Sequence, residues 1–187
     1  GYRRLAHLRY APLPGGDLAA RTPWRTALGY LSLDPHLASA FELAFQGVDP
    51  REREVAERQI ARGVNAPVAS SMGRLFDAAA AVLGLRRVAA FEGQAAMELE
   101  SLAGRRVASE IRWGIEQDAD GVLRLDPLHL LATLGMRRQR GENAADLAAD
   151  FHASVAWATV EVLRRAVEET GITTVALGGG VFQNARL

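Results

Sequence analysis

Hydrophobic residues recur at intervals of three and four along most of the chain, which is the spacing of helices that bury one face. Polar N-cap residues and first-turn prolines mark where several of these helices begin. The pattern predicts helices over residues 23–31, 36–46, 51–62, 72–83 and 94–102, a helix that starts after Pro127, and a long helix over 144–170.

The hydrophobic period changes to two in a few places, which is the spacing of strands. Residues 2–10 and 107–115 read as strands, and the turn Asp118–Gly121 followed by residues 122–125 predicts a hairpin. Residues 172–177 predict a short apolar strand that leads into a run of three glycines and a helix start. The fold class is therefore α/β, with more helix than strand.

Composition removes several kinds of chemistry. Lys+Arg and Asp+Glu both total 22, and this balance argues against a nucleic-acid partner. No apolar run reaches the roughly 18 residues that span a bilayer, so we expect no membrane partner. Lysine and cysteine are absent, which excludes a Schiff-base lysine, a P-loop lysine, a disulfide and a thiolate nucleophile. We find no secretory signal and expect a cytoplasmic protein.

A few polar residues and the glycine run are candidates for ligand contact. Glycines let a ligand approach the backbone, a following helix would present free N–H groups, and Asn184 adds a donor and an acceptor. The alternative is a tight turn packed against a neighbour. The carboxylates of Asp77, Glu98 and Glu100 are either ligand contacts or solvated helix faces.

The four histidines have no metal-ligand spacing, so we predict no metal site within the chain. His152 is predicted to be a packed or hydrogen-bonded helix residue. The three tryptophans, Trp24, Trp113 and Trp157, are predicted to lie in the core.

Three segments together are more specific than any one of them. Residues 65–77 (NAPVASSMGRLFD), 91–100 (FEGQAAMELE) and 179–184 (GGVFQN) resemble signatures of HypF, the carbamoyltransferase family of [NiFe]-hydrogenase maturation. The opening residues 2–16 and the Phe151-His152 pair also fit, so the resemblance covers essentially the whole chain in order. It implies that residues 1–187 are part of one TsaD-like carbamoyltransferase module with a partial actin/sugar-kinase/Hsp70-like (ASKHA) fold.

The resemblance also implies a reaction, in which carbamoyl-adenylate, made from carbamoyl phosphate and ATP, gives its carbamoyl group to the C-terminal cysteine of HypE. Gly178 departs from the family, which commonly has serine there. The resemblance identifies no catalytic residue in this chain, and it assigns the nucleotide or carbamoyl-adenylate contacts to Asp77, Gln94, Glu98, Gly179, Gly180 and Asn184.

The metal ligands that the resemblance implies, an upstream His-x-x-x-His pair and a downstream aspartate, are not in this chain. We therefore expect a fragment that is inactive by itself. Two alternatives remain open, an ATP-dependent phosphotransferase of the same fold superfamily and a non-catalytic docking fragment.

Overall fold

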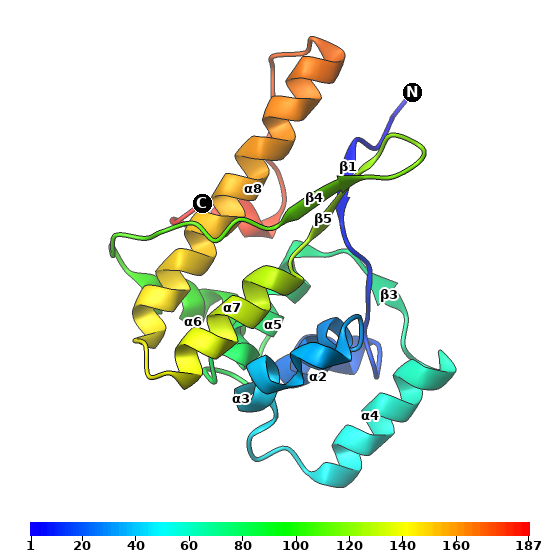
Figure 1. The fold of residues 1–187 in the computed structure, drawn as a ribbon, viewed down its shortest axis with the longest axis vertical. Coiled ribbons are helices and arrows are strands. Elements are labelled where there is room, and N and C mark those ends of the chain that lie inside the picture. The colour runs from blue at the N-terminus through cyan, green and yellow to red at the C-terminus, as the bar shows by residue number, and fades with distance from the viewer.

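The buried faces of the predicted helices meet in one core in the computed structural model, which describes residues 1–187 (Figure 1). Helix α8 crosses the molecule and projects beyond the core at one end, where a small sheet lies beside it. The α-helices are α1 (Asp17–Arg21), α2 (Pro23–Leu31), α3 (Glu42–Phe45), α4 (Pro50–Arg62), α5 (Met72–Val82), α6 (Gln94–Ala103), α7 (Leu128–Gln139) and α8 (Ala144–Thr170). Two 3-10 helices are present, η1 (Pro35–Phe41) and η2 (Gly180–Gln183).

The strands are short and form two separate sheets. They are β1 (Ala6–Leu8), β2 (Ala11–Pro12), β3 (Val68–Ala69), β4 (Gly114–Gln117) and β5 (Leu123–Asp126). The first sheet has the order β1-β5-β4, with β1 parallel to β5 and the β4–β5 hairpin antiparallel. The second sheet pairs β2 with β3. The α/β class, rich in helix and with a short hairpin, is confirmed.

Large aromatic side chains fill the centre of the helical core. Trp24, Tyr30, Phe41, Phe76 and Phe151 are each at most 2% exposed. The Phe76 and Phe151 rings meet edge to face with their centroids 4.8 Å apart, and they join α5 to α8. Helix α5 is buried along almost its whole length, so its first turn is held in a fixed position.

Two glycines let backbones meet where a side chain would not fit. A Cβ on Gly29 in α2 would lie 1.9 Å from the Pro12 carbonyl oxygen. A Cβ on Gly135 in α7 would lie 1.8 Å from the Ala40 carbonyl oxygen. These contacts bring α2 against β2 and α7 against η1.

Most predicted helices begin and end within a residue or two of the observed ones. Asn143 caps α8 as predicted, because its side chain accepts a hydrogen bond from the Ala145 amide. The predicted helix 36–46 is instead η1 followed by α3. Helix α1 was not predicted, since its five residues are too short to show a period. No helix is both long and apolar enough to cross a membrane.

The strand predicted over residues 107–115 is wrong for most of its length. This stretch lies extended against α8, and α8 side chains take the place of a partner strand. The Ser109 amide donates to the Asp150 carboxylate at 2.8 Å, and the Ile111 amide donates to the Ser154 hydroxyl at 2.8 Å. Alternation at Ile111 and Trp113 therefore reflects one face packed in the core rather than membership of a sheet, whereas Val107 is 97% exposed.

Two other predicted strands also change. The strand expected over residues 2–10 is reduced to β1, and β2 follows just beyond it in a different sheet. Residues 172–177 form no strand, because no other strand of the chain lies beside them to pair with their backbone. Ile172 and Leu177 are 64% and 57% exposed. The helix expected after the glycines is the single 3-10 turn η2.

Candidate functional site

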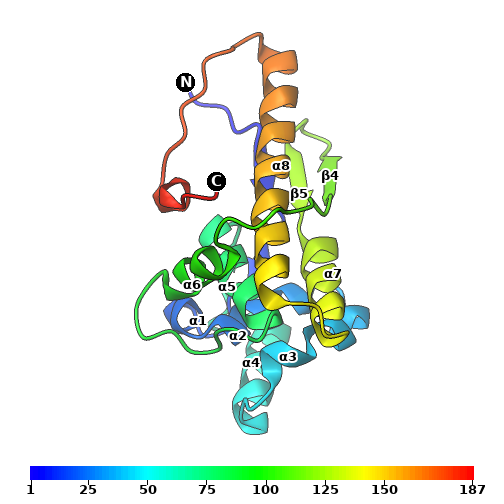
Figure 2. The same cartoon turned by 90° about the vertical axis from the view of Figure 1, so that its left-hand side faces the viewer.

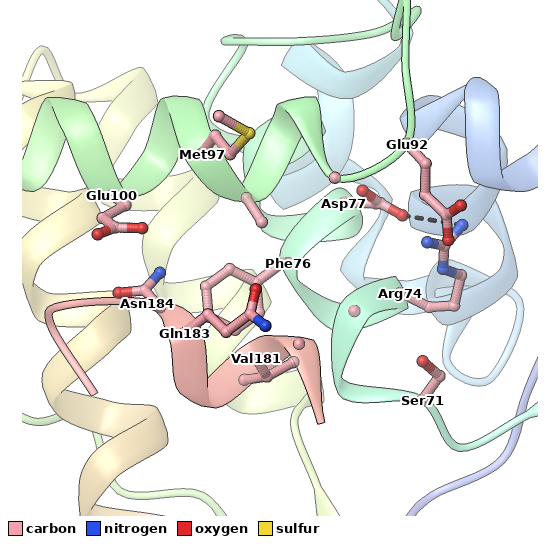
Figure 3. A pocket seen from close by; sticks show the side chains of 14 residues that line it. Ser71, Arg74, Phe76, Asp77, Glu92, Met97, Glu100, Val181, Gln183 and Asn184 are labelled. Carbon is pink, nitrogen blue, oxygen red and sulfur yellow. Dashed lines mark ion pairs between the residues drawn. The ribbon is translucent and has the colours of Figure 1, made fainter. Parts of the chain in front are cut away.

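A cavity of about 620 Å³ opens where α5, α6 and η2 meet (Figure 3). Its volume lies in the range that holds a nucleotide-sized ligand. Residues from three separate segments line it: Ser71, Gly73, Arg74, Phe76, Asp77, Glu92, Gly93, Ala96, Met97, Glu100, Gly180, Val181, Gln183 and Asn184. The fold therefore brings the glycine run beside a helix that precedes it by about a hundred residues.

The first wall of the cavity is the N-terminal part of α5. Asp77 is only 3% exposed, although it carries a carboxylate. Its Oδ2 lies 3.1 Å from Nη1 of Arg74, one helical turn earlier, but these two atoms do not have hydrogen-bond geometry and neither has another partner. Figure 3 shows the two side chains facing each other at one side of the cavity.

Burial determines the charge state of Asp77. Removal from water raises the pKa of its carboxyl from 3.8 to about 7. The Arg74 guanidinium opposes this change, and the negative charge of Glu92 adds to it. Asp77 thus lies beside the cavity with a carboxylate oxygen that no donor of the chain satisfies, and a ligand hydroxyl or amine could provide that donor.

The second wall is α6, and only one face of that helix takes part. Gly93, Ala96, Met97 and Glu100 follow the i, i+3, i+4, i+7 spacing and line the cavity. Figure 3 shows Glu100 beside Asn184, across the cavity from Asp77.

Gln94 and Glu98 lie on a different face of α6 and do not line the cavity. Both nitrogens Nε and Nη2 of Arg86 donate to the Glu98 carboxylate, and Gln94 Nε2 donates to the same group at 2.9 Å. These bonds, with that to Arg86 as the largest cause, hold the pKa of Glu98 below its usual range. Of these two residues predicted to contact a nucleotide, Glu98 is thus engaged with Arg86, and Gln94 is engaged with Glu98 and with the Ala90 amide.

The third wall is η2 and the residues that follow it. Gly180 and Asn184 line the cavity, whereas Gly179 lies just outside it with its backbone at φ +89°. Of the six residues predicted to contact a nucleotide, the structure brings together Asp77, Gly180 and Asn184. It adds Arg74 and Glu92, which were not predicted, and Glu100, whose role was left open between a ligand contact and a solvated helix face.

The helical period could have identified Glu100. Counted from Gly93, Glu100 comes almost two full turns later and returns to the same face, whereas Glu98 is rotated by about 140°. The signal was therefore present in the sequence of α6. No comparable signal marked Arg74 or Glu92. The chain has no group of three or more His, Asp or Glu side chains placed to hold a metal ion.

Comparison with known proteins first defines the class of this domain. Residues 1–187 match the family model described as the second subdomain of the Kae1-like domain of carbamoyltransferases. The chain is 41% identical, over its full length, to a carbamoyltransferase HypF of Rhodobacter capsulatus, of which it covers 24%. It is 39% identical over 97% of its length to the carbamoyltransferase HypF2 of Cupriavidus necator, of which it covers 25%.

Solved structures agree with this class. A full-length HypF in a phosphate- and nucleotide-bound form matches 98% of this chain with a TM-score of 0.91 and 38% identity. The HypF of T. kodakarensis matches 98% of the chain with a TM-score of 0.80 and 31% identity. The chain covers 24% and 25% of these two structures. The chain belongs to the HypF carbamoyltransferase family, and it spans about a quarter of the length of these relatives.

Proposed function

We propose that the protein containing this chain is a carbamoyltransferase of [NiFe]-hydrogenase maturation, and that this subdomain forms the nucleotide-facing wall of its transfer site. Carbamoyl-adenylate, made from carbamoyl phosphate and ATP, would be the donor. The C-terminal cysteine of HypE would be the acceptor, and the product would serve cyanide ligand synthesis. The reaction would take place in the cytoplasm.

One observation carries this proposal. In a chain that matches HypF throughout, the fold gathers Asp77, Gly180 and Asn184 around a single cavity of nucleotide size. The carboxylate and the asparagine amide offer an acceptor and a donor to hydroxyl or amino groups. Gly180 has no side chain and nothing within 4 Å of the position of its missing Cβ, so a phosphate or base could lie against the backbone there.

The chemistry of transfer is consistent with the composition of the chain. The acceptor thiolate attacks the carbamoyl carbon, a C–S bond forms, and the bond from that carbon to the phosphate oxygen breaks. AMP leaves with the electron pair. This chain has no cysteine, so it does not itself supply the thiolate. What this subdomain supplies is orientation of the adenylate, which brings the two reacting atoms together.

A divalent metal, if the transfer site holds one, would neutralise charge on the phosphate. The residues of this chain do not form a site for it, since no three potential ligands converge. Its ligands would come from the upstream and downstream segments that the family resemblance implies. The carboxylates that line the cavity are those of Asp77, Glu92 and Glu100.

The test uses the full-length protein with carbamoyl phosphate, ATP and HypE. The variant is Asp77→Asn, which keeps the size of the side chain and removes its charge. We expect carbamoylation of HypE, measured by intact mass, to fall at least about tenfold. Release of pyrophosphate from ATP should continue, because adenylate formation belongs to a module outside this chain. Asp17→Asn, at an exposed aspartate that does not line the cavity, is the matched control.

Other outcomes separate the alternatives. ADP in place of AMP and pyrophosphate would support a phosphotransferase. Unchanged HypE carbamoylation in the Asp77 variant would refute the assignment of this cavity. Failure of the wild-type protein to modify HypE at all would contradict the proposed reaction and favour a docking role.

A further inference from the structure

The terminal segment that forms the third wall reaches the cavity only by folding back along α8. Figure 2 shows it leaving the far end of α8, running beside that helix and ending near α6. Residues 172–177 make no sheet on the way. The wall is held in place by a few contacts near its end, and those contacts decide where the cavity-lining atoms of Asn184 lie.

Residues of α6, the residue that follows it, and α8 provide the contacts at the end of the segment. The Ala185 amide donates to Oε1 of Glu100 at 2.9 Å. Arg186 Nη1 donates to the Gly104 carbonyl at 2.9 Å. The amide side chain of Asn184 lies 3.1 Å from Nε2 of His152, which belongs to α8. Of these contacts, only the last one holds a side chain of the terminal segment that lines the cavity.

His152 is fixed in a single protonation state by its surroundings. It is 1% exposed, and its ring meets Phe76 and Phe151 edge to face, at 5.5 and 5.7 Å between centroids. Its Nδ1 lies 2.7 Å from the Ala148 carbonyl, which can only accept, so Nδ1 carries the proton. Burial lowers the pKa of the ring. A neutral ring protonated at Nδ1 has a lone pair at Nε2.

This lone pair determines which way the Asn184 amide points. Because Nε2 accepts, the atom of Asn184 that faces it must be the NH2 group. The carbonyl Oδ1 of Asn184 then lies on the other side, where it accepts from the Arg186 amide at 2.9 Å. Each end of the amide keeps one further hydrogen-bonding position, a donor on Nδ2 and an acceptor on Oδ1. Asn184 lines the cavity, so these positions are available to a ligand.

We propose that His152 is a positioning residue of the transfer site: as a hydrogen-bond acceptor on α8, it sets the orientation of the Asn184 amide and holds the glycine segment against the cavity. The proposal rests on the proposed function. His152 itself does not line the cavity, and its effect on a ligand passes through Asn184.

The test compares two substitutions, each of which places a polar group at the position of one imidazole nitrogen. In His152→Gln, the side-chain oxygen reaches the position of Nε2 and can accept from Asn184. In His152→Asn, the shorter side chain reaches the position of Nδ1 alone. Both variants are made in the full-length protein, and HypE carbamoylation and the KM for ATP are measured. We expect the Asn variant to lose about 3- to 10-fold in kcat/KM, the value of one neutral hydrogen bond, and the Gln variant to recover most of that loss.

Hydrogen exchange provides a readout that does not depend on ligand. Without nucleotide, amides of residues 184–187 should exchange faster in His152→Asn than in wild type, with His152→Gln close to wild type. Peptides from α2 report whether the core has opened. If the Asn variant unfolds the core, the comparison of wild type with His152→Gln across pH decides the question.

The contact between His152 and Asn184 should depend on pH in a direction that the groups around the ring determine. The charged groups that face His152 are Arg186 in the terminal segment, which lowers its pKa, and Glu100 on α6, which raises it. Only the neutral ring can accept from Asn184, and burial, as the largest cause, holds the pKa of the ring below its ordinary value of 6.5. The contact is therefore intact above about pH 6.5 and is lost only as the pH falls below that value and the ring is protonated. The ratio of wild-type to His152→Gln activity should therefore fall below that pH, since glutamine does not titrate.

Two results would separate failure of this inference from failure of the proposed function. If Asp77→Asn abolishes HypE carbamoylation while the two His152 variants and the wild type behave alike at every pH, the role of His152 is overturned alone. If the wild-type protein does not modify HypE but residues 184–187 still open only in His152→Asn, the contact stands and the proposed reaction fails.

Discussion

Replacement of Asp77 by asparagine should make the protein more stable at neutral pH while it weakens the proposed activity. Asparagine has the shape of a protonated aspartate, so the variant mimics the neutral form. In the folded chain the carboxyl has its pKa raised from 3.8 to about 7, chiefly by burial. Its side chain is 4% exposed, so solvent screening is small.

The magnitude follows from linkage between proton binding and folding. A carboxyl whose pKa is raised by folding stabilises the folded state, and this contribution is fully present below its pKa in the unfolded chain. The contribution is lost as the pH rises through the pKa of the folded chain. The difference between the pKa of 3.8 and the pKa of about 7 corresponds to a free energy of about 4 kcal/mol. The increase in the free energy of unfolding caused by Asp77→Asn should thus grow from about 1 kcal/mol at pH 4.5 to about 4 kcal/mol at pH 7.5. The ion pair with Arg74 needs no separate correction, because the pKa of about 7 already includes the attraction of Arg74 for the ionised carboxylate. Beside asparagine, as beside a protonated aspartate, Arg74 has no negative partner at this position.

Hydrogen exchange of peptides from α5 measures this difference in the full-length protein, after correction for the pH dependence of intrinsic exchange. The exposed Asp17→Asn substitution serves as control and should change the opening free energy by less than about 0.5 kcal/mol. Equal protection of wild type and Asp77→Asn from pH 4.5 to 7.5 would refute the reasoning, as would a variant that opens more easily. A stabilised variant that no longer transfers carbamoyl would also show that its loss of activity is not a loss of folding.

Two further substitutions test the packing and the capping of the helices. Gly135→Ala would place a Cβ 1.8 Å from the Ala40 carbonyl oxygen and should lower the free energy of unfolding by about 3 kcal/mol or more. Gly114→Ala is the control, because its Cβ would have no neighbour closer than 3.8 Å, and it should be well tolerated. Thermal unfolding compares the two variants. Asn143→Ala removes the bond to the Ala145 amide and should lower the free energy of unfolding by about 1 kcal/mol, seen as faster exchange in the first turn of α8.

The helices could be predicted because their signals are local. Asp49 and Pro50 mark the start of α4, Gly63 ends it, and Asn143 caps α8, all within a few residues of sequence. Strands depend on partners that sequence spacing does not reveal. Within residues 107–115, the Ser109 and Ile111 amides bond to carboxylate and hydroxyl groups of α8 instead of a partner strand.

Only some residues of the candidate site could be predicted from the sequence. Asp77 and the glycine run stood out, because a carboxylate on an apolar helix and three adjacent glycines are unusual. The choice between Glu98 and Glu100 depended on helical phase, which favours Glu100 for the face that carries Gly93. The contact of Asn184 with His152 joins residues 32 positions apart, and nothing local in the sequence indicates it.

The walls of the cavity differ in how firmly the fold holds them, and this difference bears on how a ligand would act. The α5 wall is fixed by the core through Phe76 and Phe151. The terminal wall is exposed along residues 171–180 and is held at its end by hydrogen bonds from α6 and α8. Segments held by few buried contacts open at low free energy. A ligand that bonds to both Asp77 and Asn184 would therefore stabilise mainly the terminal wall, and its binding would be coupled to the protonation state of His152 through the Asn184 amide.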